Sequence, residues 1–329
     1  MSRIQRYVNK NYAVLTAGLV VILIAVTIVS MVLGRYTVNL MDLFDGQETA
    51  TETVIFNIRL PRVLLAVIIG AGLSLAGCTF QTVFTNPMAS PDILGTSSGA
   101  CFGAALALLM GASRLGVQLM AFAFGLFTVG IVNFVGNMNQ NRTAMYLILV
   151  GIIISSLFNA GTSFIKLVAD PNDQLPKITY WTMGSLSNAD LREVFITFIP
   201  TLIAGIILFL MRWKINLLTL SDDEAESMGV DVRRLRMFSV ILASVLTAVS
   251  VSAAGMIGWI GLVIPNLVRM LTGNNTKQLM PMTAIIGGIY LLIVDDLARC
   301  MLATEIPIGI LTAFVGAPFF IFILLKNTQ

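Results

Sequence analysis

The feature that most constrains this chain is a series of long apolar stretches that recurs over its whole length. A helix needs about 20 mainly apolar residues to cross the hydrocarbon core of a bilayer. Inside lipid the backbone must also satisfy its own hydrogen bonds, which favours helices. The sequence therefore predicts an all-α membrane protein, one transmembrane domain over residues 1–329 with about ten spans. The candidate spans are 12–33, 63–84, 93–110, 115–135, 143–167, 194–211, 237–254, 257–271, 279–297 and 306–325.

Composition excludes several functional classes. Charged residues make up 11% of the chain, about half the share found in soluble domains. Histidine is absent, which removes the commonest metal ligand and the usual general base. No P-loop motif occurs, so ATP would have to be bound by a partner protein. The three cysteines lie in or beside apolar spans without ligand spacing and are expected to pack. We therefore expect no enzyme activity, no metal site and no nucleic-acid binding.

The distribution of basic residues predicts the orientation in the membrane. An even number of spans places both termini on one side. With the termini inside, twelve of the 20 Lys and Arg residues fall in cytoplasmic segments and eight outside. This bias agrees with the positive-inside rule, so we expect a multi-pass protein of the cell membrane with cytoplasmic termini. The first outer loop is then expected over residues 34–57, and a later outer loop includes WTMGSL at 181–186.

The stretch Ser221–Arg236 differs from the rest because eight of its sixteen residues are charged. Charges are expensive in lipid, so this stretch must lie in water between its two flanking spans. The acidic residues and Gly229 predict a short helix from Asp222 to Met228 that ends at the glycine. A second helix is expected to begin near Asp231 and continue into the next span. Since a plain connector needs only a few residues, the pattern favours a docking surface over a simple solvated loop.

One helical face of the fifth span carries small and polar residues. Gly151, Ser155, Asn159, Thr162 and Lys166 recur every three or four residues, so they share a face. Such a face either packs against another helix or lines a polar pathway, and the spacing leaves both open. No span has a charged residue near its centre, whereas ion-coupled carriers usually need one. The sequence therefore weighs against an ion-coupled secondary transporter.

Several ordered motifs resemble one family over nearly the whole chain. They are RLPR at 59–62, the glycine-rich segment ending in NP at 72–87, WTMGSL at 181–186, DEAESMGV at 223–230 and PIGILTAFVGAPFF at 307–320. The chain resembles the permease subunits of ABC importers for iron–siderophores, haem and vitamin B12. It departs from the family pattern at Asn266 and at Asn274–Asn275, where histidine is usual.

The resemblance implies a vitamin-B12-importer-type permease fold and a set of partners. These are a second permease subunit, identical or paralogous, two cytoplasmic ATPase subunits that use ATP and Mg²⁺, and an extracytoplasmic binding protein. The expected function is import of a ferric siderophore or a related metal chelate by alternating access. Vitamin B12 or haem import is the alternative within the family, and an ion-coupled secondary transporter is the alternative outside it.

The resemblance also assigns roles to residues. The ATPase-coupling residues are expected within the cytoplasmic segment 213–236 between spans six and seven: Asp222, Asp223, Glu224, Ala225 and Gly229. Residues for docking of the binding protein are Arg59, Arg62 and Arg299. Interfacial anchoring, with Arg299 paired to Asp295 or Asp296, is the alternative for these arginines. The translocation pathway is expected to include Ser155, Asn159, Thr162, Gly309, Thr312 and Gly316, and the cytoplasmic gate Asn86 and Met88.

Overall fold

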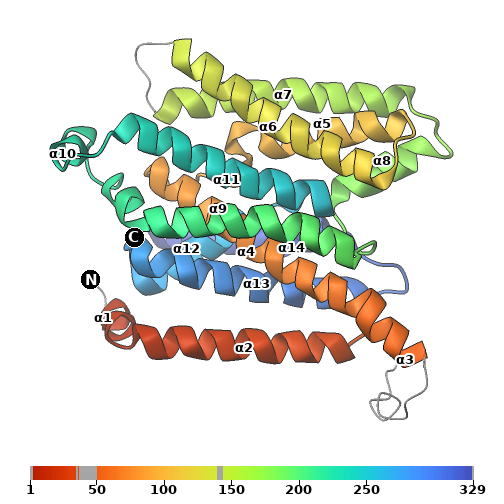
Figure 1. Ribbon diagram of the computed structural model, residues 1–329, viewed down its shortest axis with the longest axis horizontal. Coiled ribbons are helices and arrows are strands. Elements are labelled where there is room, and N and C mark those ends of the chain that lie inside the picture. The colour runs from red at the N-terminus through yellow and green to blue at the C-terminus, as the bar shows by residue number, and fades with distance from the viewer. Residues whose placement is uncertain (1–2, 35, 37–49, 139–143, 328–329) are drawn as a thin grey trace.

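The computed structural model describes residues 3–34, 36, 50–138 and 144–327. The described residues form helices joined by turns, and they contain no strand (Figure 1). Seven described helices are long and apolar enough to cross a membrane, and three shorter apolar helices accompany them. The predicted all-α architecture with about ten spans is therefore confirmed. The helices at the ten spans are α2 (Tyr12–Val32), α4 (Leu60–Val83), α5 (Thr96–Leu109), α6 (Arg114–Met138), α7 (Ala144–Val168), α9 (Leu191–Leu217), α11 (Val232–Ala254), α12 (Ile260–Thr272), α13 (Thr276–Cys300) and α14 (Ile308–Asn327).

Helix α4 lies at the centre of the bundle, where it packs against α9, α11, α12 and α13. Glycines make this packing close. A Cβ atom at Gly77 would overlap the backbone of Gly261 in α12, and one at Gly70 would overlap that of Gly287 in α13. Small residues allow membrane helices to approach at such short range. The core of the protein is therefore built around a helix whose residues are mostly buried within this chain.

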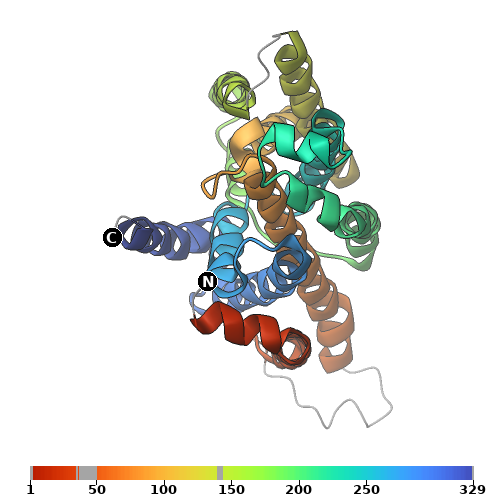
Figure 2. The same ribbon diagram turned by 90° about the vertical axis from the view of Figure 1, so that its left-hand side faces the viewer.

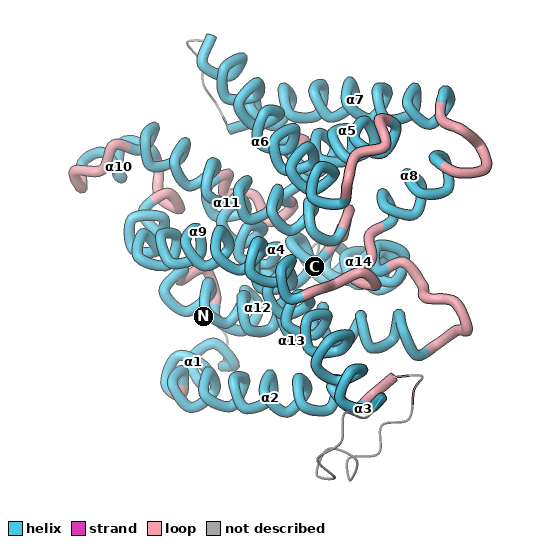
Figure 3. The backbone as a smooth tube through the Cα atoms, turned by 45° about the vertical axis from the view of Figure 1, so that its right-hand side comes forward, coloured by secondary structure: helices cyan, strands magenta, loops and turns pink. Residues whose placement is uncertain are grey.

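The long helices run roughly side by side, which gives the molecule two ends (Figure 1). Helices α1 (Arg3–Lys10) and α10 (Asp222–Ser227) lie at one end, called here the α10 end. Helices α3 (Ala50–Thr53) and α8 (Gln174–Met183) lie at the opposite, α8 end, and loops gather at both ends in Figure 3. Helix α14 projects from the bundle in Figure 2 and packs on α8, α12 and α13.

The structure corrects several predicted boundaries. The loop predicted over 34–57 is wrong from residue 50 on, because α3 and the π-helical η2 (Val54–Arg59) run directly into α4. The tryptophan of WTMGSL lies in helix α8 rather than in a loop. The span predicted at 93–110 is divided into a 3-10 turn, η3 (Pro91–Leu94), and α5. Counting apolar residues finds long lipid-facing helices, and it misses short helices whose polar residues are satisfied within the protein.

The segment between α9 and α11 is shorter than the predicted 213–236. Helix α9 continues to Leu217, and α11 begins at Val232, so the connection covers residues 218–231. The last turn of α9 persists because Ile215 and Leu217 are buried against the bundle. Packing of an apolar face thus sustains a helix beyond the point where the sequence turns polar.

Candidate functional site

The connection between α9 and α11 holds the short helix α10, as the charge pattern predicted. Ser221 caps it: its Oγ accepts a hydrogen bond from the Glu224 backbone N–H, and Glu224 Oε2 accepts one from the Ser221 N–H at 3.1 Å. This reciprocal capping box satisfies two N–H groups that a helix otherwise leaves free. The hydrogen bonds with Ser221 lower the pKa of the Glu224 carboxyl below its usual value. Local chemistry therefore fixes a carboxylate at the tip of the protein.

Helix α10 is attached to α11 by one turn and one ion pair. Gly229 has a φ of +81°, the left-handed conformation that glycine adopts without strain. Asp231 then caps α11 by accepting from the Arg234 N–H at 2.9 Å. Arg236 Nη2 lies 2.9 Å from Asp222 Oδ1, which links the two helices. A displacement of α10 would therefore be passed directly to α11.

The predicted coupling residues do not all face outward. Asp222, Asp223, Glu224 and Gly229 are exposed at the α10 end. Ala225 is 1% exposed and belongs to the core of this chain. Its methyl group therefore holds α10 against the bundle, and the surface offered to a partner is mainly acidic.

The three predicted docking arginines are buried, with exposures of 4% for Arg59 and 6% for Arg62 and Arg299. These arginines therefore offer little open basic surface on this chain, and their docking role stays a prediction. Arg59 donates to the carbonyl oxygens of Met31, Val32 and Tyr36 at 2.6–3.0 Å. These bonds tie the start of α4 to the end of α2. A charge taken out of water needs such partners, since an unpaired buried charge is costly.

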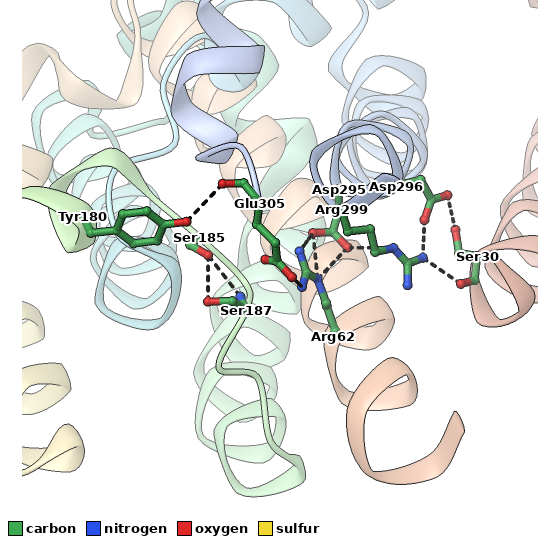
Figure 4. Close-up of polar contacts among 9 residues, drawn as sticks. All are labelled: Ser30, Arg62, Tyr180, Ser185, Ser187, Asp295, Asp296, Arg299 and Glu305. Atoms are coloured by element: carbon green, nitrogen blue, oxygen red, sulfur yellow. Dashed lines mark hydrogen bonds and ion pairs between the residues drawn. The ribbon is translucent and has the colours of Figure 1, made fainter. Parts of the chain in front are cut away.

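Arg62 and Arg299 join a network of carboxylates at the α8 end (Figure 4). Arg62 holds Asp295 through Nε and Nη2 at 2.9–3.0 Å, and its Nη1 donates to Glu305 at 2.9 Å. Arg299 donates to Asp296 and to the Ser30 carbonyl. The alternative prediction, in which Arg299 pairs with the acids of α13, thus agrees with these contacts. The network connects α2, α4 and α13 with the loop that precedes α14.

Glu305 extends this network toward α14. The Tyr180 hydroxyl of α8 donates to the Glu305 carbonyl at 3.1 Å (Figure 4). Three residues later, at the first residue of α14, the Ile308 N–H donates to the Gly184 carbonyl at 2.9 Å. The start of α14 is therefore fastened to the bundle, whereas the rest of the helix projects away from it (Figure 2).

An open cavity of about 920 Å³ lies beside α14. Its walls come from α14, the start of α12, the end of α8 and the segment before α5. Of the predicted pathway residues on α14, Gly309 lines this cavity. Thr312 is fully buried and Gly316 abuts the Trp259 side chain. The cavity lining includes Ser90, Asp92, Thr182, Met183, Met256, Trp259, Leu262, Ile310, Phe314 and Pro318.

The small and polar residues that share one face of α7 differ in their surroundings: some are packed within the chain and others are exposed. Ser155 donates to the Gly151 carbonyl at 2.7 Å and its hydroxyl sits against Gly95, so it faces η3 and α5. Thr162 is 8% exposed and donates to the Phe158 carbonyl. Asn159 is exposed on this chain. Ser155 and Thr162 therefore make contacts within this chain, whereas Asn159 is exposed, and a pathway role for the three stays a prediction.

The predicted gate residues lie in the turn over residues 84–90, which follows the C-terminal end of α4. Thr85 has a φ of +48°, and Asn86 Oδ1 accepts from the Met88 N–H at 2.9 Å. Met88 is 51% exposed. The Nδ2 group of Asn266, where the resembled family carries histidine, donates to the Pro87 carbonyl at 2.8 Å. Sequence reasoning noted Asn266 as a departure but gave no sign of this contact.

Metal-ligating side chains do not converge in the part of the chain that the structure describes. No group of three Cys, Asp or Glu residues there could hold a metal ion. Cys78 and Cys101 are buried and Cys300 is exposed, each as a free thiol. The main features that the described residues offer are an acidic tip, an ion-pair network and an open cavity.

Comparisons with known proteins agree with this arrangement. Residues 22–326 match the FecCD transport family. The chain is 38% identical to the molybdate import permease MolB of Haemophilus influenzae, over 94% of this chain and 95% of the relative. It is 33% identical to the haemin permease HmuU of Yersinia pestis, over 94% and 95%, and 33% identical to the ferric enterobactin permease FepD of Escherichia coli, over 96% of each.

A solved inward-facing structure of an ABC transporter described as of metal-chelate type superposes with a TM-score of 0.89. It is 38% identical to this chain, and the match covers 96% of this chain and 100% of the other. Such permeases are non-catalytic membrane subunits, and ATP hydrolysis takes place in a separate subunit. The helical bundle agrees with these matches. The chain is a multi-pass membrane permease subunit of ABC importers and belongs to the FecCD transport family.

Proposed function

We propose that this chain is the permease subunit of an ATP-driven importer that carries a ferric siderophore or a related metal chelate into the cytoplasm. It would pair with a second permease subunit, identical or paralogous. Two ATPase subunits would bind at the α10 end, with both termini cytoplasmic, and a binding protein would deliver the chelate at the α8 end. The exposed acidic tip of α10 supports this orientation, because a charged, capped helix in water is suited to a protein groove.

The coupling mechanism follows from how α10 is attached. ATP binding would draw the ATPase subunits together and displace the α10 helices seated on them. The Asp222–Arg236 ion pair and the short turn at Gly229 make α10 and α11 move as one unit. Helix α11 packs against α4, α6 and α9, so its movement reaches the centre of the bundle. Packed helices switch between discrete arrangements rather than deform continuously, which converts this push into alternating access.

The cavity beside α14 is the observation that carries the choice of substrate. Its lining includes Met183, Met256 and Trp259, and no Lys or Arg is among the described residues that form it. A small free oxyanion is normally held by Arg or Lys, and this lining supplies neither among the described residues. A chelate encloses its metal in an organic shell and can pass over apolar, adaptable walls such as methionine provides.

Molybdate import is a second candidate, favoured by the 38% identity to the molybdate permease of H. influenzae over nearly the whole chain. Haem and vitamin B12 remain alternatives within the family, since relatives carry those names. The four substrates differ in size and charge, so one transport experiment can separate them.

Uptake by proteoliposomes tests the proposal. The permease, its ATPase and its binding protein would be reconstituted, and entry of an iron-labelled ferric siderophore followed with ATP on the ATPase side. We expect ATP-dependent uptake that excess unlabelled chelate reduces and excess molybdate does not. An ATPase variant unable to hydrolyse ATP is the control. Uptake of labelled molybdate in place of the chelate would establish the second candidate, and accumulation without ATPase would establish a secondary carrier.

A further inference from the structure

The turn over residues 84–90 is fastened to a helix that is distant in sequence. Asn266 lies in α12 and is 6% exposed. Its Nδ2 group donates to the Pro87 carbonyl at 2.8 Å and to the Leu262 carbonyl at 2.9 Å. An amide nitrogen has two hydrogens, so both are used: one within α12 and one to the turn. Pro87 stands between the two predicted gate residues.

The turn is held together by its own hydrogen bonds, so one hydrogen bond from α12 can position the whole turn. Asn86 Oδ1 accepts from the Met88 N–H, and the Ala89 N–H donates to the Asn86 carbonyl at 3.0 Å. Thr85 takes a left-handed conformation, which is uncommon for a residue other than glycine. The Ala89 side chain is completely buried beneath the turn. Movement of the turn would therefore expose Ala89.

A separate set of contacts joins α4 itself to α12. Gln81 Nε2 donates to the Leu262 carbonyl at 3.2 Å, and Arg269 Nη1 donates to Gln81 Oε1 at 2.9 Å. The close approach of Gly77 to Gly261 holds the same two helices. Because these contacts do not involve Asn266, its loss would free the turn from α12 without separating α4 from α12.

We infer that Asn266 is a positioning residue that locks the 84–90 turn to α12, so that the turn moves when α12 moves. The inference rests on the proposed function, in which Asn86 and Met88 close the cytoplasmic end of the pathway. Its chemical requirement is a hydrogen-bond donor at this position. Asparagine provides one, and so does histidine, whose Nδ1 lies the same number of bonds from the backbone. A carboxylate of the same size does not.

Thiol modification of a buried position in the turn tests the inference on the permease alone. The background is Cys300→Ser, which removes the exposed native thiol, combined with Ala89→Cys. In this background Asn266→Asp should raise the modification rate at position 89 about tenfold or more, since a buried carbonyl loses its donor. Asn266→His should stay within about twofold of the parent rate, because it keeps a donor. Peptide mass spectrometry assigns the rates, and Cys101, 5% exposed in α5, reports general loosening.

Asn275→Asp is the matched control. It makes the same amide-to-carboxylate change at the same end of the protein, but Asn275 acts there as an acceptor, for the Lys277 N–H. A carboxylate accepts equally well, so the rate at position 89 should not change. In the assembled transporter, Asn266→Asp should raise the ATP hydrolysed per chelate delivered, and Asn266→His should restore the parent ratio.

A buried aspartic acid can take up a proton and then donate as asparagine does, so Asn266→Ala, which has no donor, is measured beside Asn266→Asp. An unchanged rate at position 89 in Asn266→Ala would overturn the inference, and so would an equal rise at Cys101. If Asn266→Asp does not accumulate, Asn266→Ala in the same background gives the same comparison. Labelling requires neither substrate nor partner. If the position-89 variants label as expected but the wild-type complex imports no chelate, the proposed function is contradicted and the role of Asn266 is left intact.

Discussion

Replacing Arg62 with methionine should cost much more stability than replacing Arg62 together with its buried partner Asp295. The side chains of Arg62 and Asp295 are 7% and 0% exposed, and three hydrogen bonds of 2.9–3.0 Å join them. Arg62→Met leaves the Asp295 carboxylate in the protein interior with Arg299 Nε, 3.8 Å away, as its remaining cation. The double variant Arg62→Met/Asp295→Leu removes both charges and fills the space with apolar groups.

The magnitude follows from the burial of the pair. Breaking a buried ion pair by removing one partner costs about 3–5 kcal/mol, whereas apolar replacement of both partners is often neutral. Because Arg299 partly compensates Asp295, we expect about 3 kcal/mol for Arg62→Met. At about 2–4 °C per kcal/mol, the melting temperature falls by roughly 6–12 °C. The double variant should lie within about 1 kcal/mol of wild type.

Thermal unfolding of the purified permease, followed by tryptophan fluorescence, measures this difference. Arg234→Met is the matched control, since Arg234 is 86% exposed and its pair with Asp231 should contribute under about 1 kcal/mol. A melting temperature within about 2 °C of wild type for Arg62→Met would refute a structural role for the pair. If that variant also lost stimulation by the binding protein, the docking role predicted for Arg62 would be supported instead.

Two further predictions concern packing and the pathway. Gly77→Ala should destabilise the protein by about 1–3 kcal/mol or more, because the added methyl meets the Gly261 backbone. Gly130→Ala, in an exposed helical position with no atom near the new methyl, should be neutral or stabilising by up to about 1 kcal/mol, and thermal unfolding compares the two. In the assembled transporter, Asn159→Cys should react with a water-soluble thiol reagent faster than Ile153→Cys, which is 66% exposed on the same helix. Equal rates would show that Asn159 faces no aqueous pathway.

The spans and the α10 helix could be predicted because their causes are local. A run of apolar residues long enough to cross a membrane forms a helix whatever its neighbours are. The capping box of α10 needs only Ser221 and Glu224, three residues apart, and Gly229 ends the helix by its own backbone freedom. The residues that determine each of these helices are close together in the sequence, so the helices can be predicted from the sequence alone.

The burial of the arginines could not be predicted, since its cause is not local. Arg62 and Asp295 are 233 residues apart, and no spacing rule connects them. The spacing of residues in α7 predicted a polar face. It did not show that Ser155 lies against Gly95 at the start of α5, or that the Ser155 and Thr162 hydroxyls donate to carbonyls of their own helix. The tie from Asn266 to Pro87 spans 179 residues. Such contacts depend on which helices lie side by side, and hydropathy carries no information on that.

The central claim is that an ATPase drives transport through the α10 segment, and one comparison of uptake rates tests it most directly. Proteoliposomes would hold the ATPase with wild-type permease, with Glu224→Gln, or with Glu224→Arg. Glutamine can still complete the capping box, so Glu224→Gln should keep ATP-dependent uptake. Glu224→Arg places a cation at the acidic tip, and its uptake should fall to the rate measured without ATP while ATP hydrolysis continues. Wild-type uptake by Glu224→Arg, with the ATPase still bound, would contradict the account.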